Sequence, residues 1–225
     1  MITIDRKHWY ENVFAKVLQV QDLIRQPITE YPDLSSKEKD QLRQTQVFKD
    51  EIVQVLAKYQ NFHLVRKFEQ TLGWALVEHL RVDEQVQGFI YPDIELQDAQ
   101  AFLYSWKDTS YVFGGLSRQG IDCSGFSQLY YLHVLGLILP KNSNDQRKLG
   151  KPTEFKTLKD HDLIFCRPFH HPDHHVVIFH SGQFWHSRRS GGVVCQSEEE
   201  FLKQFNVEDV RTLLMTCVPV YTKSP

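Results

Sequence analysis

The stretch DCSGFSQLYYLHVLGLILP, residues 122–140, decides the second half of the fold. A set of its residues recurs at helical spacing, and Pro140 then closes the segment: Phe126, Leu129, Tyr130, His133, Val134 and Leu137. The stretch therefore predicts an amphipathic helix with Cys123 placed just ahead of it.

A thiol at the start of a helix has special electrostatic surroundings. The unsatisfied backbone N–H groups there carry partial positive charge, which favours the thiolate of Cys123. Ser124 and Gly125 are small and let a substrate backbone approach the sulfur. A lone cysteine is more commonly a buried small hydrophobe, so this assignment depends on finding partners for the thiol.

Two histidines follow on neighbouring strand-like runs. His175 opens the apolar run 175–179, and His186 lies in the run 184–187. A turn at His180-Ser181 places the two rings directly opposite one another, whereas a turn at Ser181-Gly182 places them one diagonal step apart. Either register lets the rings touch. A nucleophilic thiol needs an imidazole to accept its proton and a third group to orient that imidazole.

The other elements of this half predict an α+β plan. Asp98–Trp106 is helical in pattern, residues 111–122 form a Gly-rich loop, and Leu163–Cys166 is a short apolar strand. Glu198–Phe205 is predicted as a short helix and Val210–Tyr221 as a final strand region. A helix followed by a run of antiparallel strands is an α+β arrangement.

The first half has a different texture, with short β-like runs separated by polar stretches. Four runs predict a small barrel: Asn12–Val20, Thr45–Leu56, Asn61–Val65 and Gly73–Leu80. The polar segment Gln26–Gln44 predicts a long loop with one helical turn. A helix over Gln41–Lys58 is an open alternative, because that run is charged and lacks Pro and Gly.

Composition excludes several classes of partner. The chain has 225 residues, 41% of them hydrophobic and 24% charged, with a net charge of -2. This balance gives no reason to expect nucleic acid or an anionic membrane as partner. No apolar run reaches membrane-spanning length, and Met1–Tyr10 has no apolar core of a secretory signal. Four cysteines without CxxC spacing predict reduced thiols, and we expect a cytoplasmic protein.

Six ordered blocks carry a family resemblance. They are Tyr111-Val-Phe-Gly-Gly, Asp122-Cys123-Ser124-Gly125, Leu139-Pro140, Asp162-Leu-Ile-Phe165, His175-Val-Val-Ile178 and Phe184-Trp185-His186. From about residue 98 to 195 the chain resembles the NlpC family of papain-like cell-wall endopeptidases. The resemblance implies that residues 98–225 form a papain-like domain, a helix packed on an antiparallel sheet.

The same resemblance implies roles for individual residues. Cys123 is expected to be the nucleophile, His175 the general base and His186 the orienting residue of a Cys-His-His cysteine peptidase. Tyr111 matches an aromatic residue at the mouth of the site. Asp122 and Ser124 match positions that line the substrate pocket. No metal and no cofactor are expected.

Residues 1–97 look like a bacterial SH3-like domain, on scattered aromatic and glycine positions. In the subgroup with this arrangement, a glutamate at the position of Glu51 is thought to bind the free amino terminus of the peptide. That subgroup is similar to dipeptidyl-peptidases that cut the γ-D-glutamyl–diamino acid bond of murein peptides. The expected substrate is therefore a murein-derived peptide with a free N-terminal L-alanine.

Two departures from the pattern concern the substrate. The family usually has Leu-Pro-Arg-Asp where this chain has Leu139-Pro140-Lys141-Asn142, so Asn142 replaces one negative charge in the amine pocket. The subgroup tends to carry a tyrosine before its Gly-Trp pair, where this chain has Thr71-Leu72. Neither change touches the expected catalytic residues.

Three alternatives stay open at the level of sequence. The tract His170–His175, with four histidines and one aspartate, has ligands suitable for zinc but lacks regular ligand spacing. In a second alternative the protein is a non-catalytic binding protein, in which the SH3-like first half recognises a partner. The thiol–imidazole pair can instead act as an amidase or deamidase on a protein, because a fold does not determine its substrate.

Overall fold

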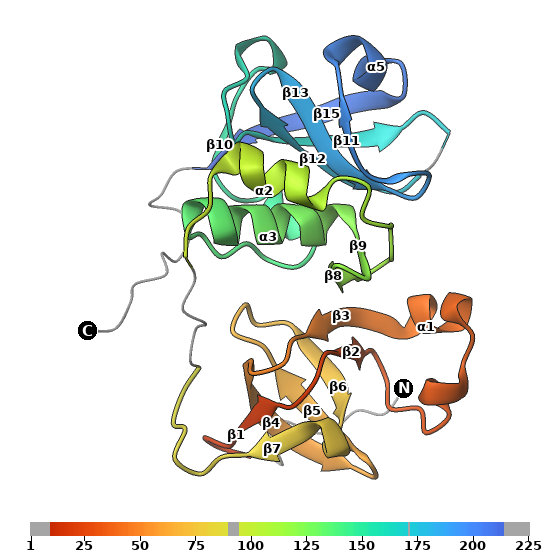
Figure 1. The fold of residues 1–225 in the computed structure, drawn as a ribbon, viewed down its shortest axis with the longest axis vertical. Coiled ribbons are helices and arrows are strands. Elements are labelled where there is room, and N and C mark those ends of the chain that lie inside the picture. Colours follow the sequence, from red (N-terminus) through yellow and green to blue (C-terminus); the bar gives the residue numbers. More distant parts are fainter. Residues whose placement is uncertain (1–9, 90–94, 171, 214–225) are drawn as a thin grey trace. The chain divides into compact units, whose positions relative to one another are not determined.

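The computed structural model describes residues 10–89, 95–170 and 172–213. The chain forms two compact units, Met1–Asp93 and Ile94–Pro225 (Figure 1). None of the helices in the described ranges is long and apolar enough to cross a membrane.

The N-terminal unit is built on one antiparallel sheet of seven short strands. Their order across the sheet is β3-β2-β6-β5-β4-β1-β7. The strands are β1 (Phe14–Val17), β2 (Gln21–Ile24), β3 (Arg43–Val47), β4 (Ile52–Tyr59), β5 (Phe62–Arg66), β6 (Leu72–Leu76) and β7 (Leu80–Val82).

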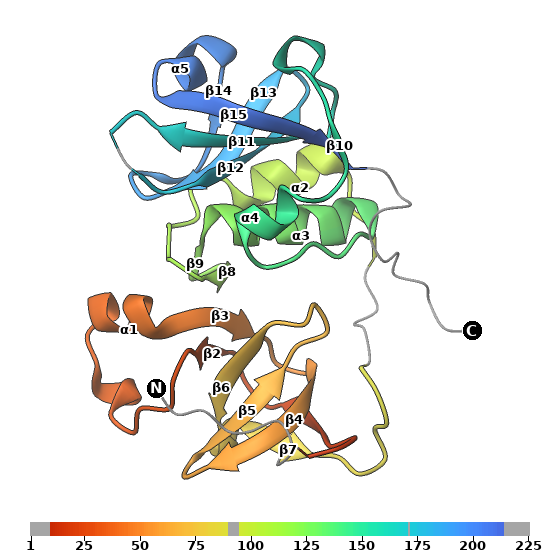
Figure 2. The ribbon, with the colours of Figure 1, turned by 180° about the vertical axis from the view of Figure 1, so that it is seen from behind.

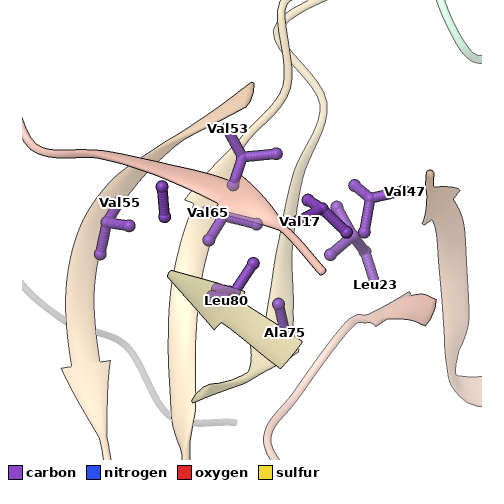
Figure 3. Packing of buried hydrophobic residues seen from close by; sticks show 9 residues of the cluster. Val17, Leu23, Val47, Val53, Val55, Val65, Ala75 and Leu80 are labelled. Carbon is purple, nitrogen blue, oxygen red and sulfur yellow. The ribbon is translucent and has the colours of Figure 1, made fainter. Parts of the chain in front are cut away.

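Small aliphatic side chains from these strands form the core of the unit. Alternate residues of a strand point to the same side, so even four-residue strands each contribute to a shared core. Figure 3 shows eight of them converging from separate strands: Val17, Leu23, Val47, Val53, Val55, Val65, Ala75 and Leu80. Ala15 belongs to the same cluster, and all nine have at most 9% exposure. Burying them is the main stabilising contribution of the sheet.

The structure corrects the sequence prediction in two places of this unit. The expected strand Thr45–Leu56 is two strands, because the chain turns at Asp50, whose φ is 69°. A helix over Gln41–Lys58 is wrong beyond Leu42, where β3 begins. Strand β4 pairs with both β1 and β5, and this ladder outweighs the local helical tendency of the run.

The polar segment contains more helix than expected. A 3₁₀ turn, η2 (Tyr31–Asp33), is followed by the helix α1 (Ser36–Leu42). Ser35 and Glu38 form a capping box, in which each side chain bonds to the backbone of the other residue. These bonds satisfy backbone N–H groups at the start of α1. Because it contains this helix, the N-terminal unit is not all-β.

The C-terminal unit is α+β, as predicted. Its six-stranded sheet is antiparallel in order β10-β15-β11-β12-β13-β14. These strands are β10 (Lys151–Pro152), β11 (Leu163–Pro168), β12 (His175–His180), β13 (Gln183–Arg188), β14 (Gly192–Gln196) and β15 (Phe205–Thr212). The expected strand over Val210–Tyr221 instead begins at Phe205, and residues 214–221 lie outside the described ranges.

Helices cover both faces of this sheet (Figures 1 and 2). The predicted helices α2 (Ala99–Trp106) and α3 (Cys123–Leu135) pack together on one face, where Tyr104 contacts Trp185 of β13. The short helix α5 (Glu198–Leu202) lies on the other face, where Phe201 stacks on Phe184. Phe184 and Trp185 are adjacent in β13, so their side chains point to opposite faces.

Helix α3 is bounded by residues that suit its two ends. Asp122 is the N-cap and accepts a bond from the Gly125 N–H, while Gly136 ends the helix with φ of 67°. The nine residues from Cys123 to Tyr131 are all buried. The helix is therefore held on both sides, which fixes the position of its first residue.

Candidate active site

Asp122 organises the start of α3 and the loop before it. Its Oδ1 accepts bonds from the Gly125 N–H at 2.6 Å and from the Ser124 hydroxyl at 2.9 Å. Its Oδ2 accepts a bond from the Gly114 N–H at 2.8 Å. Three protein donors thus occupy the carboxylate, and Cys123 follows it as the first helical residue.

The two histidines form a hydrogen-bonded pair. The turn between β12 and β13 is Ser181-Gly182, with φ values of 50° and 74°, and His180 pairs with Gln183. This is the diagonal register of the two considered above. His175 Nε2 lies 2.8 Å from His186 Nδ1.

A third residue, Gln196 of β14, extends the pair into a chain. His186 Nε2 lies 2.8 Å from Gln196 Oε1, an oxygen that can only accept. His186 Nε2 therefore carries the proton, and its Nδ1 accepts from the Nε2–H of His175. This tautomer leaves Nδ1 of His175 with a lone pair, available to take a proton.

The start of α3 meets the start of β12 at Cys123. The backbone N–H of Val176, the residue after His175, lies close enough to the Cys123 thiol to lower its pKa. The backbone N–H groups of Cys123 and Ser124 act on the pKa of this thiol in the same direction. The thiol is thus placed at the strand end that carries His175.

Burial sets the protonation of these groups. Burial raises the pKa of Cys123 to about 12, and the negative charge of Asp122 adds to the rise, although the three N–H donors lower it. Burial lowers the pKa of His175 well below its usual value, and the charge of His186 acts in the same direction. Burial lowers the pKa of His186 to about 4. The resting groups are therefore a neutral thiol and neutral imidazoles.

This result corrects one expectation from the sequence. The helix start does supply N–H groups to Cys123, but it does not leave the sulfur as a thiolate. The cost of desolvating the anion exceeds the stabilisation from the N–H donors. Both groups therefore rest neutral, and His175 keeps a free lone pair that can take the thiol proton when the sulfur attacks a carbonyl.

Aromatic rings surround the histidines and exclude water. Phe205 stacks on His175 with ring centres 5.2 Å apart and 16° between the planes. Phe201 contacts His186 edge to face at 6.3 Å. His186 is 0% exposed and His175 is 8% exposed. The rings keep both imidazoles desolvated, which is why their pKa values fall.

The other predicted site residues have varied surroundings. Tyr111 is half-buried, and its pKa is raised by burial and then by the charge of Cys123, so it lies near the thiol. Ser124 is buried and donates to Asp122. Asn142 is exposed, and its side chain contacts its sequence neighbours Lys141 and Asp145.

Glu51 belongs to the N-terminal unit and is buried there. Its Oε2 accepts a bond from the Phe48 N–H at 3.0 Å, and its Oε1 lies 3.4 Å from the ammonium group of Lys67. The carboxylate is already paired with a cation inside its own unit.

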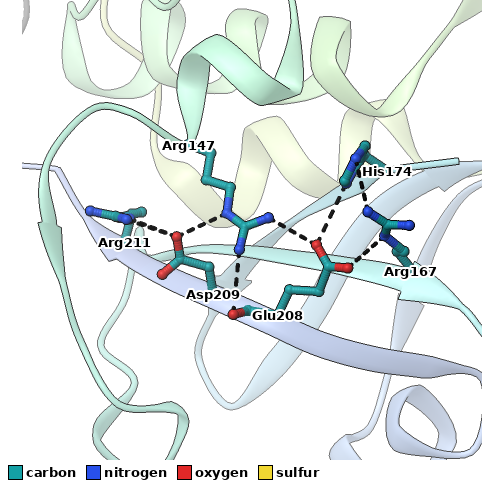
Figure 4. Close-up of polar contacts among 6 residues, drawn as sticks. All are labelled: Arg147, Arg167, His174, Glu208, Asp209 and Arg211. Atoms are coloured by element: carbon teal, nitrogen blue, oxygen red, sulfur yellow. Dashed lines mark hydrogen bonds and ion pairs between the residues drawn. The ribbon is translucent and has the colours of Figure 1, made fainter.

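The described residues of the histidine tract form no cluster of metal ligands. Within the described ranges, no group of three His, Cys, Asp or Glu side chains is placed to hold a metal ion. His174 lies 3.5 Å from Glu208 and joins a network of ion pairs beside β15 (Figure 4). His170 is exposed, and His171 lies outside the described ranges.

Sequence reasoning missed two glutamines that hold the site. Gln196 is one, and it lies on the same face of the sheet as His186, since it pairs with Phe184 of β13. Gln146 is the other: its side chain bonds to the Ser127 hydroxyl at 2.8 Å and to the Ser124 carbonyl at 3.1 Å. Extending the strand register from His186 to the next strand would have identified Gln196.

Comparison with known proteins agrees with this geometry. The sequence profile of the NlpC/P60 family matches residues 108–211. "Probable endopeptidase NlpC" of Escherichia coli K12 is 32% identical over 113 residues, which are 49% of this chain and 73% of the relative. The "Gamma-D-glutamyl-L-lysine dipeptidyl-peptidase" of Bacillus subtilis is 33% identical over 87 residues, which are 36% of this chain and 28% of the relative.

A solved structure matches both units. NlpC1 from Trichomonas vaginalis superposes with a TM-score of 0.53 at 15% identity, covering 94% of this chain and 97% of that one, which shows a shared fold. The chain spans 55% of the length of the endopeptidase relatives from Haemophilus influenzae and Escherichia coli that it also matches. The profile match and the extent of the Escherichia coli match lead to one conclusion: the chain belongs to the NlpC/P60 family.

Proposed function

We propose that this protein is a cysteine peptidase that hydrolyses peptidoglycan-derived peptides. One observation carries the proposal. The chain Gln196–His186–His175 ends on a ring nitrogen with a lone pair, and the backbone N–H of Val176, the residue after His175, acts on the buried thiol of Cys123. A nucleophile, a base and groups that orient the base are the parts that acyl transfer requires.

The proposed reaction moves one proton through His175. The Cys123 sulfur attacks the carbonyl carbon of the peptide bond while its proton passes to Nδ1 of His175. The C–N bond then breaks, the amine leaves with that proton, and a thioester remains. Water attacks the thioester, gives a proton to His175 and releases the acid, after which the proton returns to the sulfur.

The burial of His175 suits this cycle. A neutral imidazole with a lowered pKa is ready to accept a proton at neutral pH. Its pairing with His186 stabilises the imidazolium that forms, because His186 Nδ1 accepts its Nε2–H bond. Gln196 in turn keeps His186 in the tautomer that can accept.

The finer substrate assignment is also a proposal. We infer cleavage of the γ-D-glutamyl–diamino acid bond, which the name of the Bacillus subtilis relative supports. We keep the free N-terminal L-alanine as part of the proposal. Glu51 stays part of the proposal as an anchor for that amine, with Lys67 3.4 Å from its carboxylate. A cytoplasmic location stays a prediction.

The N-terminal unit fits the proposed SH3-like domain. Seven short antiparallel strands around one aliphatic core support this interpretation, with α1 as an insertion between β2 and β3. A binding protein without catalysis would not need the buried Cys123 and its histidine chain, so we favour the enzyme.

Mass spectrometry of defined murein peptides tests the proposal. Wild type should cut the γ-D-glutamyl–diamino acid bond, and Cys123→Ala should lower kcat roughly a millionfold, as for removal of other nucleophiles. Cys195→Ser is the matched control, because Cys195 is a free, half-buried thiol on β14. Turnover by Cys123→Ala, or no cleavage of any murein peptide by wild type, would refute it.

A second measurement tests the amine requirement. N-acetylation of the peptide should raise KM, and Asn142→Asp should lower KM for the free peptide by a few fold through one added negative charge. Equal cleavage of acetylated and free peptides would show that the free amine is not recognised.

A further inference from the structure

We propose that Arg189 binds a carboxylate of the peptide substrate at the mouth of the Cys123 site. This inference rests on the proposed peptidase function and names a residue that determines specificity. Arg189 lies in the turn that joins β13 to β14, three residues after His186. Three independent sets of contacts lead to it.

The first set fixes the turn against the loop that carries Tyr111. Val193 N–H donates to the Thr109 carbonyl, and Asp108 N–H donates to the Val193 carbonyl, both at 2.9 Å. Gly192 has φ of 66°, and a Cβ there would lie 2.1 Å from the Thr109 carbonyl oxygen. Only glycine allows this close approach, so the turn is held in one place.

The second set places the guanidinium over aromatic rings near the thiol. The central carbon of Arg189 lies 5.4 Å from the centre of the Tyr111 ring and 5.9 Å from that of Phe113. The charges of Cys123 and Arg189 both act on the pKa of Tyr111, in opposite directions. Arg189 and Cys123 therefore lie near the same phenol ring.

The third set shows that the guanidinium has capacity for a ligand. Among the described residues, Asp173 accepts a bond from one Arg189 nitrogen at 3.3 Å. A guanidinium has five N–H donors, and a substrate carboxylate can take two of them in parallel. The Asp173 and Arg189 side chains are 55% and 59% exposed, so solvent screens this pair and it can yield to a ligand.

The neighbouring arginine provides a contrast within the same turn. Arg188 ends β13 on the same face as His186 and donates to Gln204 at 2.6 Å. Its charge lowers the pKa values of both histidines. Arg188 is therefore held by packing within the unit, whereas Arg189, in the turn after β13, is exposed.

The proposed substrate has suitable carboxylates. A γ-glutamyl bond uses the side-chain carboxyl, so the α-carboxylate of the glutamyl residue stays free beside the scissile bond. A diamino acid at the end of the peptide carries a second free carboxylate. Both groups are planar anions that match the fork of an arginine.

Kinetics with amidated peptides test the proposal. The probes are a murein tripeptide, the same peptide with the glutamyl α-carboxyl amidated, and the same peptide with the C-terminal carboxyl amidated. Arg189→Gln should raise KM for the parent peptide roughly 10- to 100-fold with kcat within a few fold, since charged hydrogen bonds contribute about 1.5–3 kcal/mol. Arg189→Lys should give an intermediate KM, because the charge stays and the fork is lost.

The coupling between variant and peptide decides the outcome. Wild type should bind one of the two amidated peptides more weakly than the parent. Arg189→Gln should bind that amidated peptide and the parent equally. The position of the amide in that peptide then identifies the carboxylate that Arg189 binds. Lys203→Gln, an exposed cation paired with Glu199, is the charge-matched control and should change nothing. Equal KM increases in Arg189→Gln for all three peptides would overturn the proposal.

Binding to an inactive protein separates this proposal from the proposed activity. Calorimetry with Cys123→Ala and with Cys123→Ala/Arg189→Gln measures affinity without turnover. If wild type cuts none of the peptides, the proposed function is wrong, yet the two affinities still test Arg189. Equal affinities of these proteins for the parent peptide would overturn the role of Arg189 alone. The melting temperature of each variant confirms that it is folded.

Discussion

The N-terminal unit buries Lys67 among carboxylates, whereas the C-terminal unit buries a thiol and two imidazoles in a chain of neutral groups. Lys67 lies 3.4 Å from Glu51 and 3.5 Å from Glu69, and it donates to the Gln46 carbonyl at 2.7 Å. Burial by itself lowers the pKa of Lys67, but the two carboxylates outweigh it and the net shift is upward. The ammonium group is therefore held in its charged form.

The C-terminal unit treats its buried groups differently. Burial raises the pKa of Cys123 and lowers the pKa of His175, and both groups rest in their neutral forms. Charge separation between them is costly in the free site, so the proton moves to His175 only as the sulfur attacks the substrate. The difference teaches that buried titratable groups stabilise a fold when their charges are paired, and become reactive when they are neutral and hydrogen-bonded in series.

The largest expected effect is on turnover. His175→Ala removes the base and should lower kcat roughly 10⁴-fold, the upper range for general base catalysis. Lys67→Met should leave kcat within a few fold, because Lys67 belongs to the other cluster. Rates on a defined murein peptide check both variants. Comparable losses of kcat in the two variants would contradict the division between a catalytic and a structural cluster.

The next effect is on stability, in the opposite unit. Lys67→Met leaves Glu51 and Glu69 buried without their cation and should lower the free energy of unfolding by about 3–5 kcal/mol. Denaturation followed by hydrogen exchange should locate this loss in residues 10–89. Lys16→Met is the control, since Lys16 forms a half-exposed pair with Asp50 and should cost at most about 1 kcal/mol. A similar cost for both variants would show that the buried cluster has no special role.

A smaller effect separates orientation from proton transfer. Gln196→Leu leaves His186 Nε2 buried without its acceptor and should lower stability by about 1–3 kcal/mol. It should also slow turnover, but less than His175→Ala does. His186→Gln should keep more activity than His186→Ala, because an amide can still accept the His175 N–H. Full loss in every His186 variant would indicate that His186 itself transfers the proton.

The smallest effect is a pH dependence of opposite sign for the Glu51 contribution in the N-terminal unit and the His175 and His186 contributions in the C-terminal unit. His175 and His186 have lowered pKa values in the folded protein. Below pH about 6.5 the unfolded chain therefore binds more protons than the folded C-terminal unit, so the stability of this unit decreases as the pH is lowered. Burial raises the pKa of Glu51, so its contribution runs the other way: it is present at low pH and is lost as pH rises through the raised value. Each proton changes the free energy by about 1.4 kcal/mol per pH unit.

Hydrogen exchange at pH 5 and pH 7 measures the two units separately. Glu51→Gln should remove the Glu51 part from the N-terminal unit, and His186→Gln should weaken the dependence of the C-terminal unit. If neither substitution alters the pH dependence of its own unit, the assigned contributions of Glu51 and His186 are wrong.

The local residue pattern predicted the structure correctly where a single helix or hairpin forms. The helical spacing after Cys123 predicted α3, and the apolar runs around Ser181-Gly182 predicted the hairpin that carries His175 and His186. The local residue pattern was wrong where pairing with distant strands decides the structure. The run Thr45–Leu56 reads as one strand, yet pairing with β1 and β5 begins only after the turn at Asp50.

By itself, the sequence determined the α+β class of the second unit, the helix that starts at Cys123 and the pair of histidines one hairpin apart. These features depend on the spacing of residues along the chain, because that spacing decides which side chains lie on the same face of a helix or strand. Tertiary structure alone decided which turn register the hairpin takes, that Gln196 completes the histidine chain, and that Cys123 rests as a neutral thiol. These depend on burial and on the packing of β14, Phe201 and Phe205 around the site, since the energy of a charge is set by the surroundings that only the folded chain supplies.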